Sequence, residues 1–115
     1  MRDWDEVVAY ACSLPDVEMG TYYRDTVPTV NGKGFVGRSR EHDSFGVRTS
    51  SIEEKHMLIE TDPDTFWETP HYANWPAVLV RYGANEADDR IKLYIRRAWW
   101  DRLKAKQRKA YGERP

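Results

Sequence analysis

The chain has almost no cysteine and no long apolar run, and both absences narrow what it can be. Cys12 is the only cysteine among 115 residues, which excludes an internal disulfide and a multi-cysteine zinc site. No segment approaches the roughly 20 consecutive apolar residues that span a bilayer, and the acidic residues 1–6 do not resemble a secretion signal. We therefore expect a soluble cytoplasmic protein with no membrane partner, and we expect Cys12 to be buried on a helix face.

Sequence patterns for metal, nucleotide or nucleophilic chemistry are missing as well. The three histidines, His42, His56 and His71, do not have the spacing of metal ligands. Residues 31–34 combine Gly with Lys, but they lack the Ser or Thr of a phosphate-binding loop and open no helix. They predict a tight hairpin turn instead, because Asn and Gly accept positive φ. We expect no metal, no cofactor and no enzymatic activity.

What the chain does contain is enough apolar surface for one core. Hydrophobic residues make up 40% of it, and five Trp and seven Tyr supply large rings. Two independent cores would each be too small at this length. We expect one domain over residues 1–103 and favour a monomer. Residues 104–115 have little apolar content and predict a basic, flexible C-terminal tail.

Apolar residues at steps of three and four predict three helices. The first covers residues 3–14, where Asp3 is placed to cap the N-terminus. The second follows Ser51, a similar capping residue, and ends near residue 60. The third and longest begins near residue 88 and carries its apolar stripe as far as Leu103. Helices at both ends of the chain and one in the middle therefore frame the strand-forming regions.

Strand-forming residues gather in two blocks between these helices. The block at 20–49 predicts three antiparallel strands joined by turns at 31–34 and 41–44. Residues 77–82 predict a central strand, preceded by a short extended piece. The order is α-β(3)-α-β(2)-α. This α+β order predicts an antiparallel sheet with helices packed mainly on one side.

The ring-rich segment before the last strand carries the most specific signal. Its marked residues, continuing into the strand, are Pro70, His71, Tyr72, Trp75, Pro76 and Arg81. Together with the order of elements, this segment resembles the MmcQ/YjbR-like family over essentially the whole chain. The resemblance implies an α+β sandwich similar to secretion chaperones and frataxin, and it implies DNA binding.

Charge is divided sharply along the chain. Residues 1–89 carry a net charge of −9 and residues 90–115 carry +8, although the whole sums to −1. A phosphate-binding surface on the last helix and tail would use Lys92, Arg96, Arg97, Trp100, Arg102, Lys104, Lys106, Arg108 and Lys109. Adjacent helical residues point about 100° apart, so Trp100 could be an exposed stacking ring beside a buried Trp99. The same residues could form a solvated face or contact a protein partner.

His71 has the widest chemical range of the motif residues, because imidazole can act as acid, base or ligand near neutral pH. A hydrogen bond from its ring to the backbone of the turn is the simplest interpretation. A binding contact is the second, and catalysis is the weakest because no nucleophile partner is indicated. The leading hypothesis is a non-enzymatic domain that contacts DNA through the C-terminal helix. The alternative is a protein-interaction or chaperone-like domain.

Overall fold

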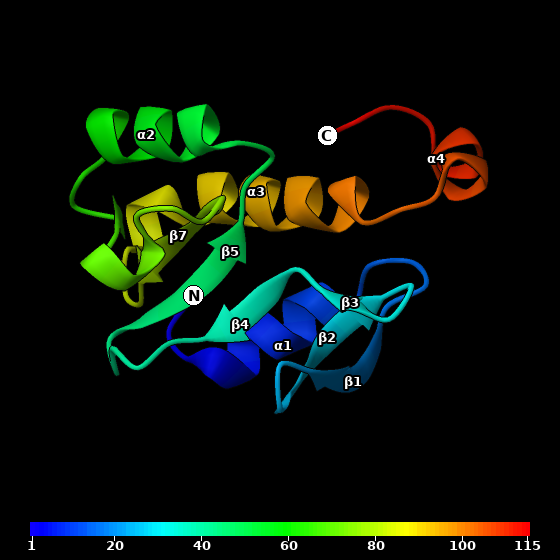
Figure 1. The fold of residues 1–115 in the computed structure, drawn as a ribbon, viewed down its shortest axis with the longest axis horizontal. Helices are drawn as coiled ribbons and strands as arrows, with labels where there is room; N and C mark the ends of the chain where they lie inside the picture. Colours follow the sequence, from blue (N-terminus) through cyan, green and yellow to red (C-terminus); the bar gives the residue numbers. More distant parts are fainter.

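Four helices and two small antiparallel sheets make up the α+β fold of the computed structural model, which describes residues 1–115 (Figure 1). The helices are α1 (Trp4–Cys12), α2 (Ile52–Thr61), α3 (Asp88–Asp101) and α4 (Ala105–Tyr111), with 3₁₀ turns η1 (Pro70–Tyr72) and η2 (Asn85–Ala87). The first three helices confirm the predicted ones. The predicted caps are also present, since Asp3 accepts from the Glu6 amide at 2.9 Å and Ser51 accepts from the Glu54 amide at 3.0 Å.

Seven short strands form the sheets. They are β1 (Glu18–Tyr22), β2 (Asp25–Val30), β3 (Lys33–Gly34), β4 (Val36–Arg38), β5 (Ser44–Arg48), β6 (Phe66–Trp67) and β7 (Ala77–Arg81). One sheet has the order β1-β2-β3 and the other β4-β5-β7-β6, with every pair antiparallel. The strand predicted at 77–82 is confirmed as β7, and the short extended piece predicted before it corresponds to β6.

The first strand block differs from the prediction of three strands in a single sheet. It contains five strands that are divided between two sheets. A two-residue turn joins β1 to β2 at Tyr23 and Arg24, whose φ angles are +49° and +68°. Neither residue is of the Gly or Asn type that signals such turns, which is why the sequence did not reveal the turn that separates β1 from β2. Phe35, which is buried, separates β3 from β4 where the chain passes from one sheet to the other.

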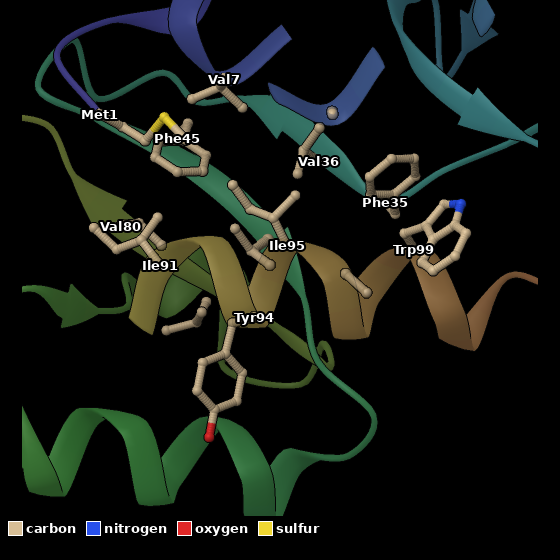
Figure 2. Packing of buried hydrophobic residues seen from close by; sticks show 14 of the residues in the cluster. Met1, Val7, Phe35, Val36, Phe45, Val80, Ile91, Tyr94, Ile95 and Trp99 are labelled. Atoms are coloured by element: carbon tan, nitrogen blue, oxygen red, sulfur yellow. The ribbon is translucent and has the colours of Figure 1, made fainter. Parts of the chain in front are cut away.

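The core lies between α3, α1 and one face of the four-stranded sheet. Ile91 and Ile95 on α3 are buried together with Val36 and Phe45 of the sheet (Figure 2). Val7 packs into the same cluster from α1. The apolar stripe predicted on the last helix is thus confirmed as its core face.

The opposite face of the same sheet carries very different residues. Side chains alternate between the two faces along a strand. Val36 faces the core, so the next position in β4, Gly37, lies on the outer face. Its register partner on β5 is Gly46, and Gly46 in turn pairs with Leu79 of β7. This outer face therefore has two glycines side by side on neighbouring strands.

Cys12 is exposed, which corrects the expectation of a buried thiol. It is the last residue of α1, so no further turn of helix covers it. Its Sγ lies 3.6 Å from Sδ of Met19. Partial desolvation raises the pKa of the thiol above its ordinary value, which keeps the less reactive protonated form.

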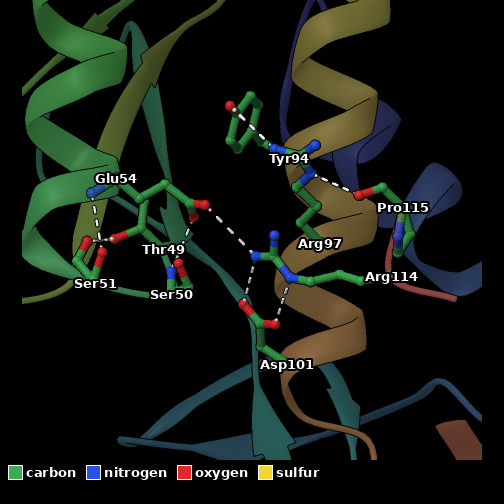
Figure 3. Close-up of polar contacts among 9 residues, drawn as sticks. All are labelled: Thr49, Ser50, Ser51, Glu54, Tyr94, Arg97, Asp101, Arg114 and Pro115. Atoms are coloured by element: carbon green, nitrogen blue, oxygen red, sulfur yellow. Dashed lines mark hydrogen bonds and ion pairs between the residues drawn. The ribbon is translucent and has the colours of Figure 1, made fainter.

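The segment predicted to be a flexible tail contains α4 and further contacts. Tyr111 Oη donates to Asp16 Oδ2 at 2.6 Å. Arg114 pairs with Asp101 at 3.0 Å and with Glu54 at 3.6 Å, and Arg97 Nε donates to the Pro115 carbonyl at 2.8 Å (Figure 3). These partners are far away in sequence, so local apolar content did not reveal them. The mobility of residues 104–115 stays a prediction.

No helix in the structure is both long enough and apolar enough to cross a membrane.

Replacing Phe45 with Ala tests the core. The side chain is fully buried and its ring stacks on Tyr82 with centroids 5.4 Å apart. We expect the free energy of unfolding to fall by about 3–5 kcal/mol, since the large cavity cannot collapse. Urea unfolding followed by circular dichroism measures the loss. The exposed Met57→Ala serves as the control and should change stability by less than about 0.5 kcal/mol; equal effects would show that the core is placed wrongly.

Candidate functional site

A groove of about 470 Å³ lies over the outer face of β4 and β5. The floor is formed by Gly37 and Gly46, and the lining comes from both sheets, from the η1 loop and from the end of α3. We call this site the groove. Its polar and aromatic lining residues are Tyr22, Tyr23, Asp25, Arg38, Arg48, His71, Tyr72, Trp75 and Arg102.

The floor is largely open, because the Tyr72 hydroxyl is the one side-chain group that comes close to the two glycines. A Cβ atom at Gly37 would meet no atom within 4 Å. A Cβ atom at Gly46 would lie 3.6 Å from the Gly37 carbonyl oxygen and 3.9 Å from Tyr72 Oη, both ordinary contacts. The groove therefore ends on bare backbone rather than on side chains.

The turn between β1 and β2 supplies one aromatic wall. Tyr22 and Tyr23 meet edge to face with centroids 4.5 Å apart, and Tyr23 is 78% exposed. Gly34 allows this arrangement, because a Cβ there would lie only 2.8 Å from the Tyr22 ring. The Tyr22 ring consequently lies against β3, while Tyr23 stands at the rim.

The loop of residues 68–76, which contains η1, supplies the opposite wall. The ammonium group of Lys55 on α2 is fully buried and donates to the carbonyl oxygens of Tyr72 at 2.8 Å, Ala73 at 3.3 Å and Trp75 at 2.8 Å. Glu68 lies 3.5 Å from the same nitrogen. These contacts hold the loop carbonyls toward α2, and Trp75, which lines the groove, is 54% exposed.

Sequence reasoning did not identify Lys55, although a signal for it exists. Lys55, Leu58 and Ile59 are spaced at three and four residues, which places all three on one side of α2. A lysine on the apolar side of a helix predicts a buried ammonium group that needs acceptors. The acceptors lie 17 to 20 residues away, so only the fold could identify them.

Three arginines make the groove cationic. Of these arginines, Arg38 has an acidic neighbour in the groove, since its Nε lies 3.8 Å from Asp25 Oδ2. No carboxylate forms an ion pair with Arg48 or Arg102, and both guanidinium groups line the groove. Burial, together with repulsion from Arg48, lowers the pKa of Arg102 below its ordinary value. Arginine nevertheless stays protonated in proteins, so two uncompensated cations face the same space.

The Arg102 side chain is held in place by neutral acceptors. Its Nε donates to the Gly34 carbonyl at 3.1 Å, and its Nη2 donates to Tyr22 Oη at 3.3 Å. The guanidinium carbon lies 5.9 Å from the centroid of the Tyr22 ring. Neither acceptor neutralises the charge, and the remaining N–H groups are free for another acceptor.

Four of the six motif residues reach the groove, namely His71, Tyr72, Trp75 and Pro76. Pro70 begins η1, which positions them. Arg81 lies elsewhere, with its guanidinium 4.8 Å from the Trp67 ring and a hydrogen bond to the Pro63 carbonyl at 2.9 Å. Burial raises the pKa of the Tyr72 hydroxyl above its ordinary value, so this group is neutral and can donate or accept at the floor.

His71 does not make the backbone hydrogen bond that was expected of it. Its exposed ring meets Tyr72 edge to face, with centroids 5.5 Å apart. No carboxylate forms an ion pair with its ring. No group of three or more His, Cys, Asp or Glu side chains is arranged to hold a metal ion.

Several of the C-terminal basic residues have partners within the fold. Lys92 pairs with Asp88 at 3.4 Å, and Arg96 donates to Tyr10 Oη of α1 at 2.8 Å. Arg97 donates to the Pro115 carbonyl, and Arg108 donates to the Trp100 carbonyl at 3.3 Å. Lys104, Lys106 and Lys109 are exposed. Only Arg102 of this predicted set lines the groove.

Trp100 is 7% exposed, which corrects the prediction of a stacking ring at the surface. Trp99 is buried as well. The two rings meet edge to face, with centroids 6.3 Å apart, and the Arg108 guanidinium of α4 lies 5.9 Å from the Trp100 ring. Although Trp99 and Trp100 point about 100° apart on α3, Trp100 is not exposed, because α4 follows and covers its ring.

Comparison with known proteins gives partial similarity to proteins that are themselves uncharacterized. The chain is 42% identical over 57 residues to protein Mb2600 of Mycobacterium bovis and to protein Rv2570 of Mycobacterium tuberculosis. The match covers 50% of this chain and 43% of each mycobacterial protein, so it spans less than half of their length. No protein family model and no solved structure matches the chain.

Replacing Lys55 with Met tests whether its ammonium group holds the groove wall. We expect the free energy of unfolding to fall by about 1.5–3 kcal/mol, because hydrogen bonds to charged groups have this net value. Hydrogen exchange should also show that the amides of residues 68–76 exchange faster in Lys55→Met than in the unchanged protein, and that the exchange of core amides rises less.

The matched control is Lys106→Met, which removes the same charge from the exposed side of α4. It should leave both the stability and the exchange pattern unchanged. If the amides of residues 68–76 keep their protection in the Lys55→Met protein, the loop is held by other contacts.

Proposed function

We propose that this chain is a non-enzymatic binding domain that takes single-stranded DNA into the groove. The observation that carries the proposal is the pair of arginines, Arg48 and Arg102, which line the groove without a carboxylate partner. Two like charges that face one recess repel each other, and an anion bound between them would relieve the repulsion. Phosphate is one of the anions whose geometry the planar guanidinium fork matches with two hydrogen bonds.

The rings around the arginines favour a nucleic acid over a simple anion. Proteins that bind single strands combine cationic grooves with aromatic side chains on which bases stack. Tyr23 and Trp75 are the most exposed rings of the groove, and they come from opposite walls. The resemblance to the MmcQ/YjbR-like family, carried by His71, Tyr72 and Trp75, supports the same class of ligand.

The groove replaces the last helix as the proposed contact surface. Arg102, at the C-terminal end of α3, is the one residue shared by the two surfaces. Lys106 and Lys109 on α4 would then contribute only long-range attraction for phosphate, which is screened by salt.

A protein partner is the second candidate, and the exposed rings favour it. Trp75 is 54% and Tyr23 78% exposed, and aromatic residues of this kind often carry the binding energy of protein interfaces. Salt separates the two candidates. Binding to phosphates weakens steeply as salt rises, whereas binding to an apolar surface does not.

Arg48→Gln tests the proposal with a labelled single-stranded oligonucleotide. We expect the dissociation constant, measured by fluorescence anisotropy at about 50 mM salt, to rise about tenfold, because a charge-assisted contact is lost. The slope of log K against log salt should become shallower by about 0.7 for each phosphate contact removed.

Lys106→Gln is the control of equal charge, because Lys106 is exposed on α4 outside the groove. It should bind almost as the unchanged protein does. Two results would contradict the proposal: no binding at about 50 mM salt, or equal losses in the two variants.

A further inference from the structure

The two floor glycines are the feature of the groove that the fold itself does not explain. Gly34 is required by packing, because a Cβ there would lie 2.8 Å from the Tyr22 ring. Gly20 is similarly restricted, with Thr29 Oγ1 at 3.0 Å from such an atom. Gly37 has no neighbour within 4 Å and Gly46 has only ordinary contacts. Neither has a positive φ that would require glycine.

Glycine inside a strand weakens the strand, and it often marks a place where a ligand approaches the backbone. Gly37 and Gly46 face each other on neighbouring strands, so together they form a flat patch of peptide backbone. Side chains would normally project from such a pair. The missing side chains leave room for a flat group to lie on the sheet.

We propose that the groove holds one unpaired nucleotide, whose base lies on the floor of Gly37 and Gly46 and whose phosphate binds Arg48 and Arg102. This inference rests on the proposed function and specifies what the site recognises. Arg102 is already oriented by the Gly34 carbonyl and Tyr22 Oη, so little side-chain entropy is lost when it meets a phosphate.

The size of the groove agrees with a small-molecule ligand, the class to which a single nucleotide belongs. Its volume of about 470 Å³ falls within the range of about 300–1,000 Å³ that is typical of small-molecule sites. A base within a duplex has both faces stacked and its pairing edge occupied, so it cannot lie on the floor. Tyr72 Oη, which is neutral and stands 3.9 Å from the Cβ position of Gly46, is placed to hydrogen-bond the edge of an unpaired base.

Gly37→Val fills the floor without removing any charge. The site is open, and Val has a high preference for strands, so the variant should fold at least as stably as the unchanged protein. Gly37→Ala adds a smaller side chain and gives a graded comparison. Thr21→Val is the control, because it places the same side chain on an exposed strand position outside the groove.

Four probes are compared by anisotropy or calorimetry: adenosine 5′-monophosphate, inorganic phosphate, a single-stranded oligonucleotide and a blunt-ended duplex. We expect Gly37→Val to weaken oligonucleotide binding about tenfold or more, with a smaller loss for Gly37→Ala and none for Thr21→Val. The duplex should bind more weakly than the single strand, and inorganic phosphate should be unaffected by Gly37→Val.

The mononucleotide distinguishes the source of the base. If the mononucleotide binds and Gly37→Val abolishes that binding, a free nucleotide satisfies the site. If only the oligonucleotide binds and Gly37→Val abolishes that binding, the nucleotide must belong to a strand. Either outcome supports the inference. Unchanged oligonucleotide binding in Gly37→Val, or a duplex that binds as tightly as the single strand, would overturn it. If Gly37→Val leaves oligonucleotide binding unchanged but Arg48→Gln weakens it, the proposed function would still stand; a duplex that binds as tightly as the single strand would contradict both proposals.

Discussion

The buried ammonium group of Lys55 is the interaction on which the rest of the site depends. A lysine ammonium is costly to remove from water unless acceptors replace its hydration. Three carbonyl oxygens of the loop and the nearby carboxylate of Glu68 do so here. By collecting these carbonyls on the side of α2, Lys55 determines which way the loop faces and therefore where its rings lie.

The groove exists because the strands are divided between two sheets. A single continuous sheet would have extended past β4 and left its outer face flat. Instead the chain changes sheet at Phe35, and the β1–β2 hairpin stands beside β4 and β5 as a separate wall. Arg102 connects the two parts, since it extends from the end of α3 to the Gly34 carbonyl and Tyr22 Oη. The unpaired guanidinium group of Arg102 and the ring of Tyr22 are thereby held in fixed positions, as a preformed binding site requires.

Sequence alone predicted the elements that depend on local patterns. The helix periodicity of Ile91 and Ile95, the caps at Asp3 and Ser51 and the Asn31 turn follow from neighbouring residues, and all are confirmed. The motif around His71 also indicated part of the groove wall. What could not be predicted depends on distant pairs: the acceptors of Lys55, the position of Arg102 beside Tyr22, and the burial of Trp100 under Arg108. Charge counting also does not show which basic side chains are already engaged within the fold, as Arg96 is with Tyr10.

Mapping of backbone amide chemical shifts during titration with a short single-stranded oligothymidylate tests the central claim most directly. If the groove binds the strand, the largest shifts cluster at Gly37, Gly46, Arg48 and Trp75, and the amide signals of Lys106 and Lys109 on α4 move little. Shifts centred on α4, or spread evenly over all exposed lysines and arginines, would contradict it.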